Sequence, residues 1–344
     1  MGSGRAGYCK IMPQDPAPGE GAGASGGIDR RRAERKGLSM EPIRFDGQAA
    51  IVTGAGAGLG KSYATFLAAR GARVLVNDLG SGYADQERSA GPAQQVAREI
   101  VASGGQAVAN ADSVADWEGA QRMVEQCLAA FGRVDIVINN AGILRDRSFL
   151  KMPVEDFQMV LGVHLLGAIY VTRAAFPAMK EQAYGRIVLT TSTSGLFGVF
   201  GQTNYSAAKL GLVGFMNALK QEGDRYNILV NAVAPLAATR LSRPTGFFPP
   251  EMEPLLRPEL VTPLVAWFCS QRCGVSGDIV EAGGGYFAKV QIMEGQGVRF
   301  EPRRELTPEM VAERYGQISD MSGARPFDSA NQQMQTALAP LWGK

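Results

Sequence analysis

The sequence predicts an α/β fold in which a doubly wound, parallel, seven-stranded sheet carries helices on both faces. Two observations support this prediction. From residue 48 onward, short apolar runs alternate with stretches of helical periodicity, and the first apolar run ends in a glycine-rich turn at residues 53–60. Strands that alternate with helices favour parallel pairing in a sheet that is covered on both sides. Ligands of such sheets bind beyond the carboxyl ends of the strands.

The predicted elements follow from hydrophobic periodicity. Seven short apolar runs bounded by Gly, Asp or Asn are predicted to be strands, at residues 49–53, 73–77, 107–110, 134–139, 186–191, 228–234 and 278–281. Five stretches with apolar residues three and four apart are predicted to be helices, at residues 61–70, 92–102, 116–131, 154–180 and 204–226. The order of these elements gives the alternation of strand and helix.

Three segments of different character are expected. Residues 1–40 are rich in Gly, Pro, Ala and Arg and are predicted to be disordered, with a basic targeting segment as the alternative. Residues 41–285 form the α/β domain. Residues 286–344 form a C-terminal extension, with a hairpin expected at 289–300, a helix beginning at 307–309 and a further helix at 328–341.

Composition restricts the function classes. The 344 residues are 45% apolar and carry 35 basic and 33 acidic side chains, a net charge of +2, so we expect neither a nucleic-acid partner nor an anionic membrane surface. No run of 18 apolar residues is present, and no membrane span is expected. Four scattered cysteines and a single remote histidine, His164, suit neither a metal site nor a disulfide framework. We therefore expect no metal and a reducing, cytoplasmic location.

The glycine-rich turn is a candidate dinucleotide site. Gly54, Gly58 and Gly60 follow an apolar run and precede a helix, where backbone N–H groups can face a pyrophosphate. Asp78 lies at the tip of the second predicted strand, where a carboxylate would accept hydrogen bonds from the adenosine ribose and repel a 2′-phosphate. This favours NAD over NADP, although Lys61 beside the turn is a basic feature. Plain turn residues are the alternative interpretation for this segment.

Tyr205 and Lys209 form the candidate catalytic pair. They lie four residues apart on a predicted helix and can therefore point into one pocket. A cation near the phenol favours the phenolate, so Lys209 is expected to lower the pKa of Tyr205 into a range useful for proton transfer. Ser192 lies thirteen residues before the tyrosine, and Ser194 is the second candidate. Either hydroxyl could instead satisfy the end of a strand.

These motifs, taken in order, resemble the short-chain dehydrogenase/reductase family over residues 45 to 285. The resemblance rests on the turn at 53–60, Asp112, the Asn139-Asn140-Ala141-Gly142 segment, Ser192 and the Tyr205-to-Lys209 segment. Residues 77–80, 110–114, 142–148 and 163–165 are more narrowly similar to the (3R)-hydroxyacyl-CoA dehydrogenase unit of peroxisomal multifunctional enzymes type 2. The resemblance implies a Rossmann fold and an NAD(P)-dependent oxidoreductase that acts on CH–OH groups.

The resemblance also implies roles for individual residues. Tyr205 would exchange the proton with the substrate oxygen, Ser192 would hydrogen-bond that oxygen, and Lys209 would support the tyrosine and hold the nicotinamide ribose. The cofactor would be bound by Gly54, Ala57, Gly58, Leu59, Gly60, Asp78, Asp112, Ser113, Asn140, Gly142, Tyr205, Lys209, Pro235 and Thr239. Leu236 replaces a glycine of many relatives, which puts the local turn geometry in question.

His164 stands where most members of the family have asparagine. In the family this residue shapes a helix kink whose backbone carbonyl holds a water on a proton path from the lysine. The hydroxyacyl-CoA branch resembles this chain in carrying histidine. A supporting or packing role is expected, with a direct catalytic role as the alternative.

The expected reaction is hydride transfer between a secondary alcohol and NAD, with (3R)-3-hydroxyacyl-CoA as the first substrate candidate. A hydroxysteroid dehydrogenase, a 3-oxoacyl-ACP-type reductase and a non-enzymatic dinucleotide-sensing scaffold are the alternatives.

Four arginines are candidate CoA contacts, namely Arg145, Arg147, Arg240 and Arg243, and the apolar segment 241–259 is a candidate lid. A homodimer or homotetramer is expected through the helices at 154–180 and 204–226. The ending Leu341 to Lys344 is not a peroxisomal signal, and we expect a free-standing enzyme without fused hydratase or sterol-carrier domains.

Overall fold

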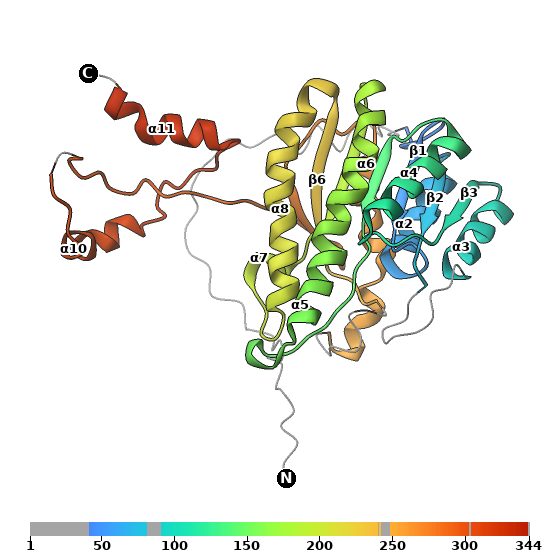
Figure 1. Cartoon of the computed structure of the whole chain (residues 1–344), viewed down its shortest axis with the longest axis horizontal. Helices are drawn as coiled ribbons and strands as arrows, with labels where there is room; N and C mark the ends of the chain where they lie inside the picture. The colour runs from blue at the N-terminus through green and yellow to red at the C-terminus, as the bar shows by residue number, and fades with distance from the viewer. Residues whose placement is uncertain (1–40, 81–90, 240, 242–247, 303, 343–344) are drawn as a thin grey trace, which may run out of the picture.

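The structure, a computed structural model, describes residues 41–80, 91–239, 241, 248–302 and 304–342. Its centre is one eight-stranded sheet with the strand order β3-β2-β1-β4-β5-β6-β7-β8 (Figure 1). The strands are β1 (Ala49–Thr53), β2 (Arg73–Asn77), β3 (Gln106–Asn110), β4 (Ile136–Asn139), β5 (Gly185–Thr190), β6 (Ile228–Pro235), β7 (Ile279–Gly283) and β8 (Tyr286–Val290). The pairs from β3 through β7 are parallel. The predicted doubly wound parallel sheet is confirmed.

The eighth strand differs from the prediction. Strand β8 pairs antiparallel with β7, so that Gly283 lies opposite Tyr286. The two residues between the strands, Gly284 and Gly285, have φ of 58° and 83°, which is the backbone that two-residue hairpin turns require. The hairpin therefore closes on this glycine pair rather than within residues 289–300. An alternation-based search misses it because β8 is short and largely exposed.

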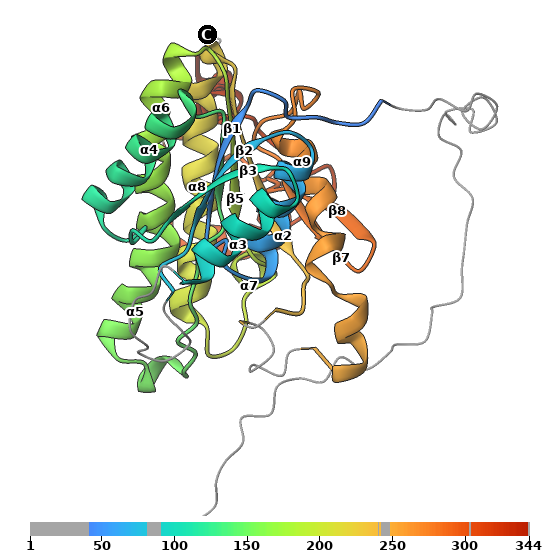
Figure 2. The same cartoon turned by 90° about the vertical axis from the view of Figure 1, so that its right-hand side faces the viewer.

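Helices cover both faces of the sheet (Figure 2). Helices α2 (Gly58–Ala69), α3 (Gly91–Ala102) and α9 (Thr262–Cys269) pack against one face in one apolar cluster. Helices α4 (Trp117–Phe131), α6 (Gly167–Glu181) and α8 (Thr203–Gly223) pack against the other in a second cluster. Strands β1 and β4, buried on both faces, separate the two clusters. The short helices α7 (Thr193–Phe197) and α9 were not predicted from the sequence.

The longest predicted helix contains a π-helical turn in its middle. Residues 154–180 form α5 (Val154–Leu161), a π-helical turn (Gly162–Leu166) and α6, all in one direction. The whole stretch Val154–Glu181 is long and apolar enough to cross a membrane by length and composition alone. However, Ala168, Val171 and Met179 are buried in the core. Packing against the sheet therefore accounts for its apolar character. The π turn places His164 beside the cleft described below.

The C-terminal extension projects from the sheet (Figure 1). It contains α10 (Pro308–Ile318) and α11 (Ala330–Trp342), joined to the preceding segment by the Glu294–Arg325 bridge. Thr307 caps α10 through a bond from the Met310 N–H, as the Thr-Pro-Glu signal predicted. Helix α10 has no buried residue. The predicted disordered segment, residues 1–40, lies outside the described residues.

Candidate active site

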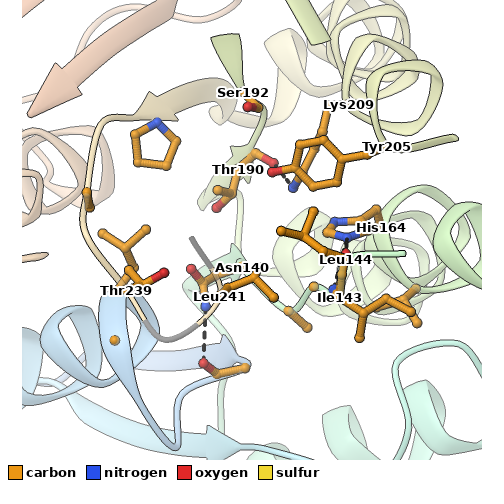
Figure 3. Close-up of a pocket in the computed structure, with 18 of the residues that line it drawn as sticks. Asn140, Ile143, Leu144, His164, Thr190, Ser192, Tyr205, Lys209, Thr239 and Leu241 are labelled. Atoms are coloured by element: carbon orange, nitrogen blue, oxygen red, sulfur yellow. Dashed lines mark hydrogen bonds between the residues drawn. The ribbon is translucent and has the colours of Figure 1, made fainter. Parts of the chain in front are cut away.

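A cleft of about 330 Å³ lies at the carboxyl ends of the central strands. The turn after β1 forms one side, and the Tyr205 end of α8 forms the other. The open space between them is visible in Figure 3, where the Tyr205 hydroxyl and the Lys209 ammonium face Asn140 and Thr239. The position agrees with the rule that doubly wound sheets bind ligands at the carboxyl ends of their strands.

The glycine turn is held in a backbone that other residues would strain. Gly54 and Gly58 have φ of 63° and 53°, in the left-handed region. Gly56 has ordinary φ, but a side chain there would meet Asp78 Oδ2 at 2.7 Å. Instead its N–H donates to Asp78 Oδ2 at 2.9 Å, and the Gly80 N–H donates to Oδ1, also at 2.9 Å. Asp78 thus joins the tip of β2 to the turn.

Asn140 fixes the same turn from the other side. Its Nδ2 donates to the carbonyls of Thr53 and Gly54 at 2.9 and 3.1 Å, and its backbone N–H donates to Thr53 Oγ1 at 3.0 Å. Gly60 lies beneath the turn and not on the cleft wall. A side chain at this position would meet Gly54 O and, at 2.6 Å, Asn140 Nδ2. The third glycine of the motif is therefore a packing requirement.

Asp112 lies farther along the same wall. Its Oδ1 accepts from Arg122 at 2.7 Å, its backbone carbonyl accepts from Asn77 Nδ2 at 2.9 Å, and it lines the cleft beside Ser113. The carboxylate is therefore oriented by Arg122 of α4 and by Asn110 of β3, whose Nδ2 donates to Oδ2 at 2.8 Å.

Ser192 and Tyr205 meet at the opposite wall. Ser192 is the N-cap of α7 and accepts a bond from the Ser194 N–H at 3.2 Å, so the start of this short helix sets the direction of its hydroxyl. A hydrogen bond from Ser192 lowers the pKa of Tyr205. Both Ser192 and Ser194 line the cleft, and Ser192, the first candidate, is the serine that lowers the pKa of Tyr205.

The charge relation between Tyr205 and Lys209 differs from the expectation. Burial raises the pKa of Tyr205 to about 12, against the lowering by Ser192, and the Asp146 carboxylate raises it further. Burial lowers the pKa of Lys209 to about 7. The Lys209 ammonium lies 5.5 Å from the phenol ring centroid and donates to Thr190 O at 2.5 Å. Burial therefore outweighs the lowering by Ser192, and the expected lowering of the Tyr205 pKa by Lys209 is not found in this structure.

His164 is buried at the edge of the cleft. Its ring lies edge-on to Tyr205 with centroids 5.0 Å apart, and its Nε2 lies 2.7 Å from Ile143 O and 3.0 Å from Ile143 N. Burial, together with Lys209, holds the pKa of His164 well below its ordinary value. A neutral imidazole in a fixed orientation supports the expected packing role. Gly142 is needed beside it, because a side chain there would collide with the ring.

Most of the predicted site residues line the one cleft. They are Gly54, Ala57, Gly58, Leu59, Asp78, Asp112, Ser113, Asn140, Gly142, Ser192, Tyr205, Lys209, Pro235 and Thr239. Leu236 also lines it, and its N–H donates to Ala282 O at 2.8 Å, so Leu236 extends the pairing of β6 with β7 by one residue.

Sequence reasoning missed several lining residues. Thr190 contributes its backbone carbonyl, which accepts from Lys209, and no sequence signal marks a backbone contact of this kind. Gln202 could have been found, since it lies three residues before Tyr205 at the start of α8. Leu241 and Phe248 of the candidate lid line the cleft, but Arg240 and residues 242–247, with Arg243 among them, lie outside the described residues.

Arg145 lines the cleft, and both Arg145 and Arg147 lie 3.6 Å from Asp156.

Known proteins are similar to this chain in sequence and fold. A short-chain type dehydrogenase/reductase of Mycobacterium tuberculosis is 48% identical over 275 residues, which cover 80% of this chain and 95% of that protein. Peroxisomal multifunctional enzyme type 2 of Drosophila melanogaster is 44% identical over 301 residues, covering 87% of this chain and 50% of that protein. Its full-length structure superimposes with a TM-score of 0.73 and 38% identity over the same shares of the two chains, 87% and 50%. The chain thus spans about half the length of this curated relative.

A third relative is a solved 7α-hydroxysteroid dehydrogenase complexed with NADH and 7-oxo glycochenodeoxycholic acid. It is 28% identical, with a TM-score of 0.63 over 70% of this chain and 95% of that chain. The family model described as short chain dehydrogenase matches residues 48–243, which include the glycine turn, Ser192, Tyr205 and Lys209. The chain belongs to the short-chain dehydrogenase family and is an oxidoreductase that acts on CH–OH groups.

Proposed function

We propose that this protein oxidises (3R)-3-hydroxyacyl-CoA to 3-oxoacyl-CoA with NAD, or runs the reverse reduction. The observation that carries the proposal is the meeting of Ser192 and Tyr205 on one wall of a cleft whose other wall is the glycine turn with Asp78. One wall suits a dinucleotide and the other suits proton exchange with an alcohol.

The cleft fits a nicotinamide dinucleotide. Gly58 faces Thr239, and a Cβ built on Gly58 would lie 3.5 Å from Thr239 Cγ2, so the missing side chain leaves space at the N-terminus of α2. That N-terminus presents N–H groups suited to a pyrophosphate. Asp78 and Asp112 would hold the adenosine half, and Asn140, Pro235 and Thr239 the nicotinamide half. When bound, the dinucleotide supplies the acceptor for the hydride from the carbinol carbon.

The catalytic wall would handle the proton. Tyr205 would accept the hydroxyl proton of the substrate as the C–H bond breaks, and would return it in the reduction. Ser192 would donate a hydrogen bond to the same substrate oxygen and hold it against the phenol. Lys209 would place a positive charge beside the phenolate as it forms. The raised pKa of Tyr205 favours the proton-carrying form at neutral pH, so oxidation is expected to speed up as the pH rises.

Two features favour NAD over NADP. Asp78 places a carboxylate at the tip of β2, where the ribose hydroxyls of adenosine would lie and where a phosphate would be repelled. Lys61, the basic residue beside the turn, is engaged with Glu99 at 2.7 Å. The Glu99 carboxylate therefore offsets the charge of Lys61 and weakens its attraction for a 2′-phosphate.

The substrate assignment rests on the relatives and on the lining of the cleft. Several relatives are peroxisomal multifunctional enzymes type 2 or hydratase-dehydrogenase-epimerases by name. Apolar residues of the cleft lining include Leu144, Val199, Leu236 and Phe248, and Arg145 also lines the cleft. Apolar side chains suit an acyl chain, and a guanidinium suits a CoA phosphate. Hydroxysteroids are the second candidate, because a steroid dehydrogenase shares the fold.

We also propose a homodimer or homotetramer and a cytoplasmic location. Leu166 and Leu210 are exposed on the π turn and on α8, 42% and 48% respectively, which a neighbouring subunit would cover. A monomer mass measured by sedimentation would contradict the proposed homodimer or homotetramer. The location is tested by fractionation, since several relatives are named as peroxisomal.

The test is a spectrophotometric assay of NADH formation with (3R)-3-hydroxyacyl-CoA and with hydroxysteroids, repeated with NADP. We expect turnover of the acyl-CoA with NAD, and its loss in Tyr205→Phe. Turnover of hydroxysteroids alone would contradict the proposed acyl-CoA substrate and leave the proposed mechanism in place. Binding of NADH without turnover of any alcohol would support the sensing scaffold instead.

A further inference from the structure

The first turn of α8, which carries Tyr205, is held by the chain segment that follows β4. The Arg147 N–H donates to Gly201 O at 2.9 Å, just ahead of the helix. Within the helix, Asn204 Nδ2 donates to Arg145 O at 3.1 Å, and Asn204 Oδ1 accepts from the Tyr205 N–H at 2.7 Å. The backbone of Tyr205 is therefore connected to residue 145 through one buried amide.

A side-chain hydrogen bond joins the same two segments. The residue that precedes the first turn of a helix often caps it with its side chain, but Gln202 makes no such bond to α8. Instead, Gln202 Nε2 donates to Asp146 Oδ2 at 2.7 Å. An ionised carboxylate only accepts, so this bond fixes which end of the amide faces Asp146. Because Gln202 lines the cleft, Asp146 is linked to the cleft wall beside Tyr205.

The arginines on either side of Asp146 in the chain do not neutralise it. Arg145 and Arg147 each lie 3.6 Å from Asp156 of α5. Asp146 Oδ1 is buried and has no hydrogen-bond partner among the described residues. Burial raises the pKa of Asp146, and the bond from Gln202 lowers it. A carboxylate that is sheltered from water acts on neighbouring groups more strongly than one in solvent.

The Tyr205 phenol lies among groups of different charge. The Ser192 hydroxyl is at the start of α7, and the neutral His164 ring is edge-on to the phenol, with centroids 5.0 Å apart. The Lys209 ammonium is 5.5 Å from the phenol centroid. Burial is the largest cause of the raised pKa of Tyr205, the Ser192 bond lowers it, and the Asp146 carboxylate raises it. Asp146 is the anion of this set.

We propose that Asp146 is a positioning residue for Tyr205 and acts in two ways. Through Gln202 it holds the first turn of α8 beside the cleft, and its negative charge keeps the Tyr205 phenol in the proton-carrying form. Asp146 thereby sets the pH at which the enzyme begins to oxidise its alcohol. The inference rests on the proposed function, in which Tyr205 exchanges the proton with the substrate.

The effect of the charge is tested with Asp146→Asn, which keeps an oxygen acceptor for Gln202 and removes the negative charge. The phenolate then forms more readily, so the alkaline rise of the oxidation rate should move to lower pH. Asp156→Asn is the matched control, because it removes a carboxylate that pairs with the two arginines and makes no bond to α8. It should leave the pH of the rise unchanged. A rise that stays in place or moves to higher pH in Asp146→Asn would overturn the proposal.

The effect on position is tested by breaking the hydrogen bond from either end. Asp146→Leu removes the acceptor together with the charge, whereas Gln202→Leu removes the donor and keeps the carboxylate. Both should lower kcat by about tenfold or more, because a displacement of about 1 Å at a reacting group can cost about 10²-fold. In Gln202→Leu the alkaline rise should stay near its wild-type pH. A wild-type kcat in Gln202→Leu would contradict positioning through this bond, whether or not Asp146→Leu folds.

A measurement without substrate separates this inference from the proposed function. The full chain has 9 tyrosines, and in a protein labelled with ¹³C at tyrosine Cζ the Tyr205 resonance is the one missing from Tyr205→Phe. Its shift toward the phenolate should begin at lower pH in Asp146→Asn than in the wild type or in Asp156→Asn. That result without turnover of any alcohol would support the role of Asp146 and contradict only the proposed function. The same onset in all three proteins would overturn the inference even if the acyl-CoA is turned over.

Discussion

The two walls of the cleft are built in opposite ways. On the cofactor wall, polar groups are paired: Asp78 accepts from two backbone N–H groups, and Asn140 donates to two carbonyls. On the catalytic wall, ionisable groups are buried with few partners. Lys209 is 3% exposed with its pKa lowered, the pKa of Tyr205 is raised, and Thr190 Oγ1 has no partner among the described residues.

The difference separates binding from chemistry. Residues of the cofactor wall stabilise the fold and shape the site together, so losing one should cost both stability and cofactor affinity. Residues of the catalytic wall are held in states that their surroundings disfavour, so losing one should cost activity while stability is kept or gained.

The largest effect is expected for Tyr205→Phe. The change removes the proton acceptor and keeps the ring, so kcat should fall by about 10³–10⁴-fold. The affinity for NADH, followed by its fluorescence, should remain within about threefold, because the phenol lies on the opposite wall from the turn. If Tyr205→Phe loses affinity for NADH and keeps its kcat, Tyr205 belongs to the cofactor wall and not to the catalytic wall.

Lys209→Met should abolish most activity and yet stabilise the protein. The folded pKa near 7 lies below the usual lysine value, so between about pH 7 and pH 10 the unfolded chain binds more protons and wild-type stability rises with pH. Below pH 7 the full cost of the buried ammonium is present. The variant should therefore have a Tm several degrees higher at pH 7, by about 2–4 °C per kcal/mol, with the gain shrinking toward pH 10.

The control for that experiment is Lys180→Met, on the exposed end of α6. It should leave Tm and its pH dependence close to those of the wild type. If Lys209→Met melts below the wild type at pH 7, the buried ammonium is stabilising and the contrast between the walls fails.

Ser192→Ala should lower kcat by about 10²-fold, the usual loss for one positioned hydrogen bond to a reacting oxygen. The same change raises the pKa of Tyr205 further, since the Ser192 bond lowers it. The alkaline rise of the oxidation rate should therefore move to higher pH in the variant. Ser194→Ala is the matched hydroxyl deletion, and a larger loss there would exchange the roles of the two serines.

Asp78→Asn is expected to have the smallest kinetic effect. It keeps one of the two acceptors for the turn and removes the negative charge, so KM for NAD should rise about tenfold and the preference over NADP should shrink. Asp78→Ala removes the acceptor of Gly56 and Gly80 as well, and should also lower Tm. Unchanged discrimination in Asp78→Asn would place the choice of cofactor elsewhere.

The features that could be predicted from the sequence are those that depend on local patterns of residues. The strands of the parallel sheet and the residues of both walls follow from apolar runs, glycine spacing and the i, i+4 pair on α8. The sequence did not predict β8, because two adjacent glycines indicate a turn without showing that an exposed strand follows. The family resemblance implied a helix kink at His164, and the structure has a π turn there, which the apolar pattern alone did not predict.

The charge states of the site could not be predicted either. Spacing places Lys209 near Tyr205, but only the structure shows the ammonium donating to Thr190 O and lying 5.5 Å from the ring centroid. Burial depends on the packing of α7, α8 and the π turn, which no single segment encodes.

Hydride transfer between substrate and cofactor is the central claim, and an isotope label follows it directly. The measurement is mass spectrometry of NADH formed from NAD and a (3R)-3-hydroxyacyl-CoA that carries deuterium at C3. We expect NADH containing one deuterium, and no labelled NADH with Tyr205→Phe. Unlabelled NADH, or no NADH from a protein that binds the cofactor, would contradict it.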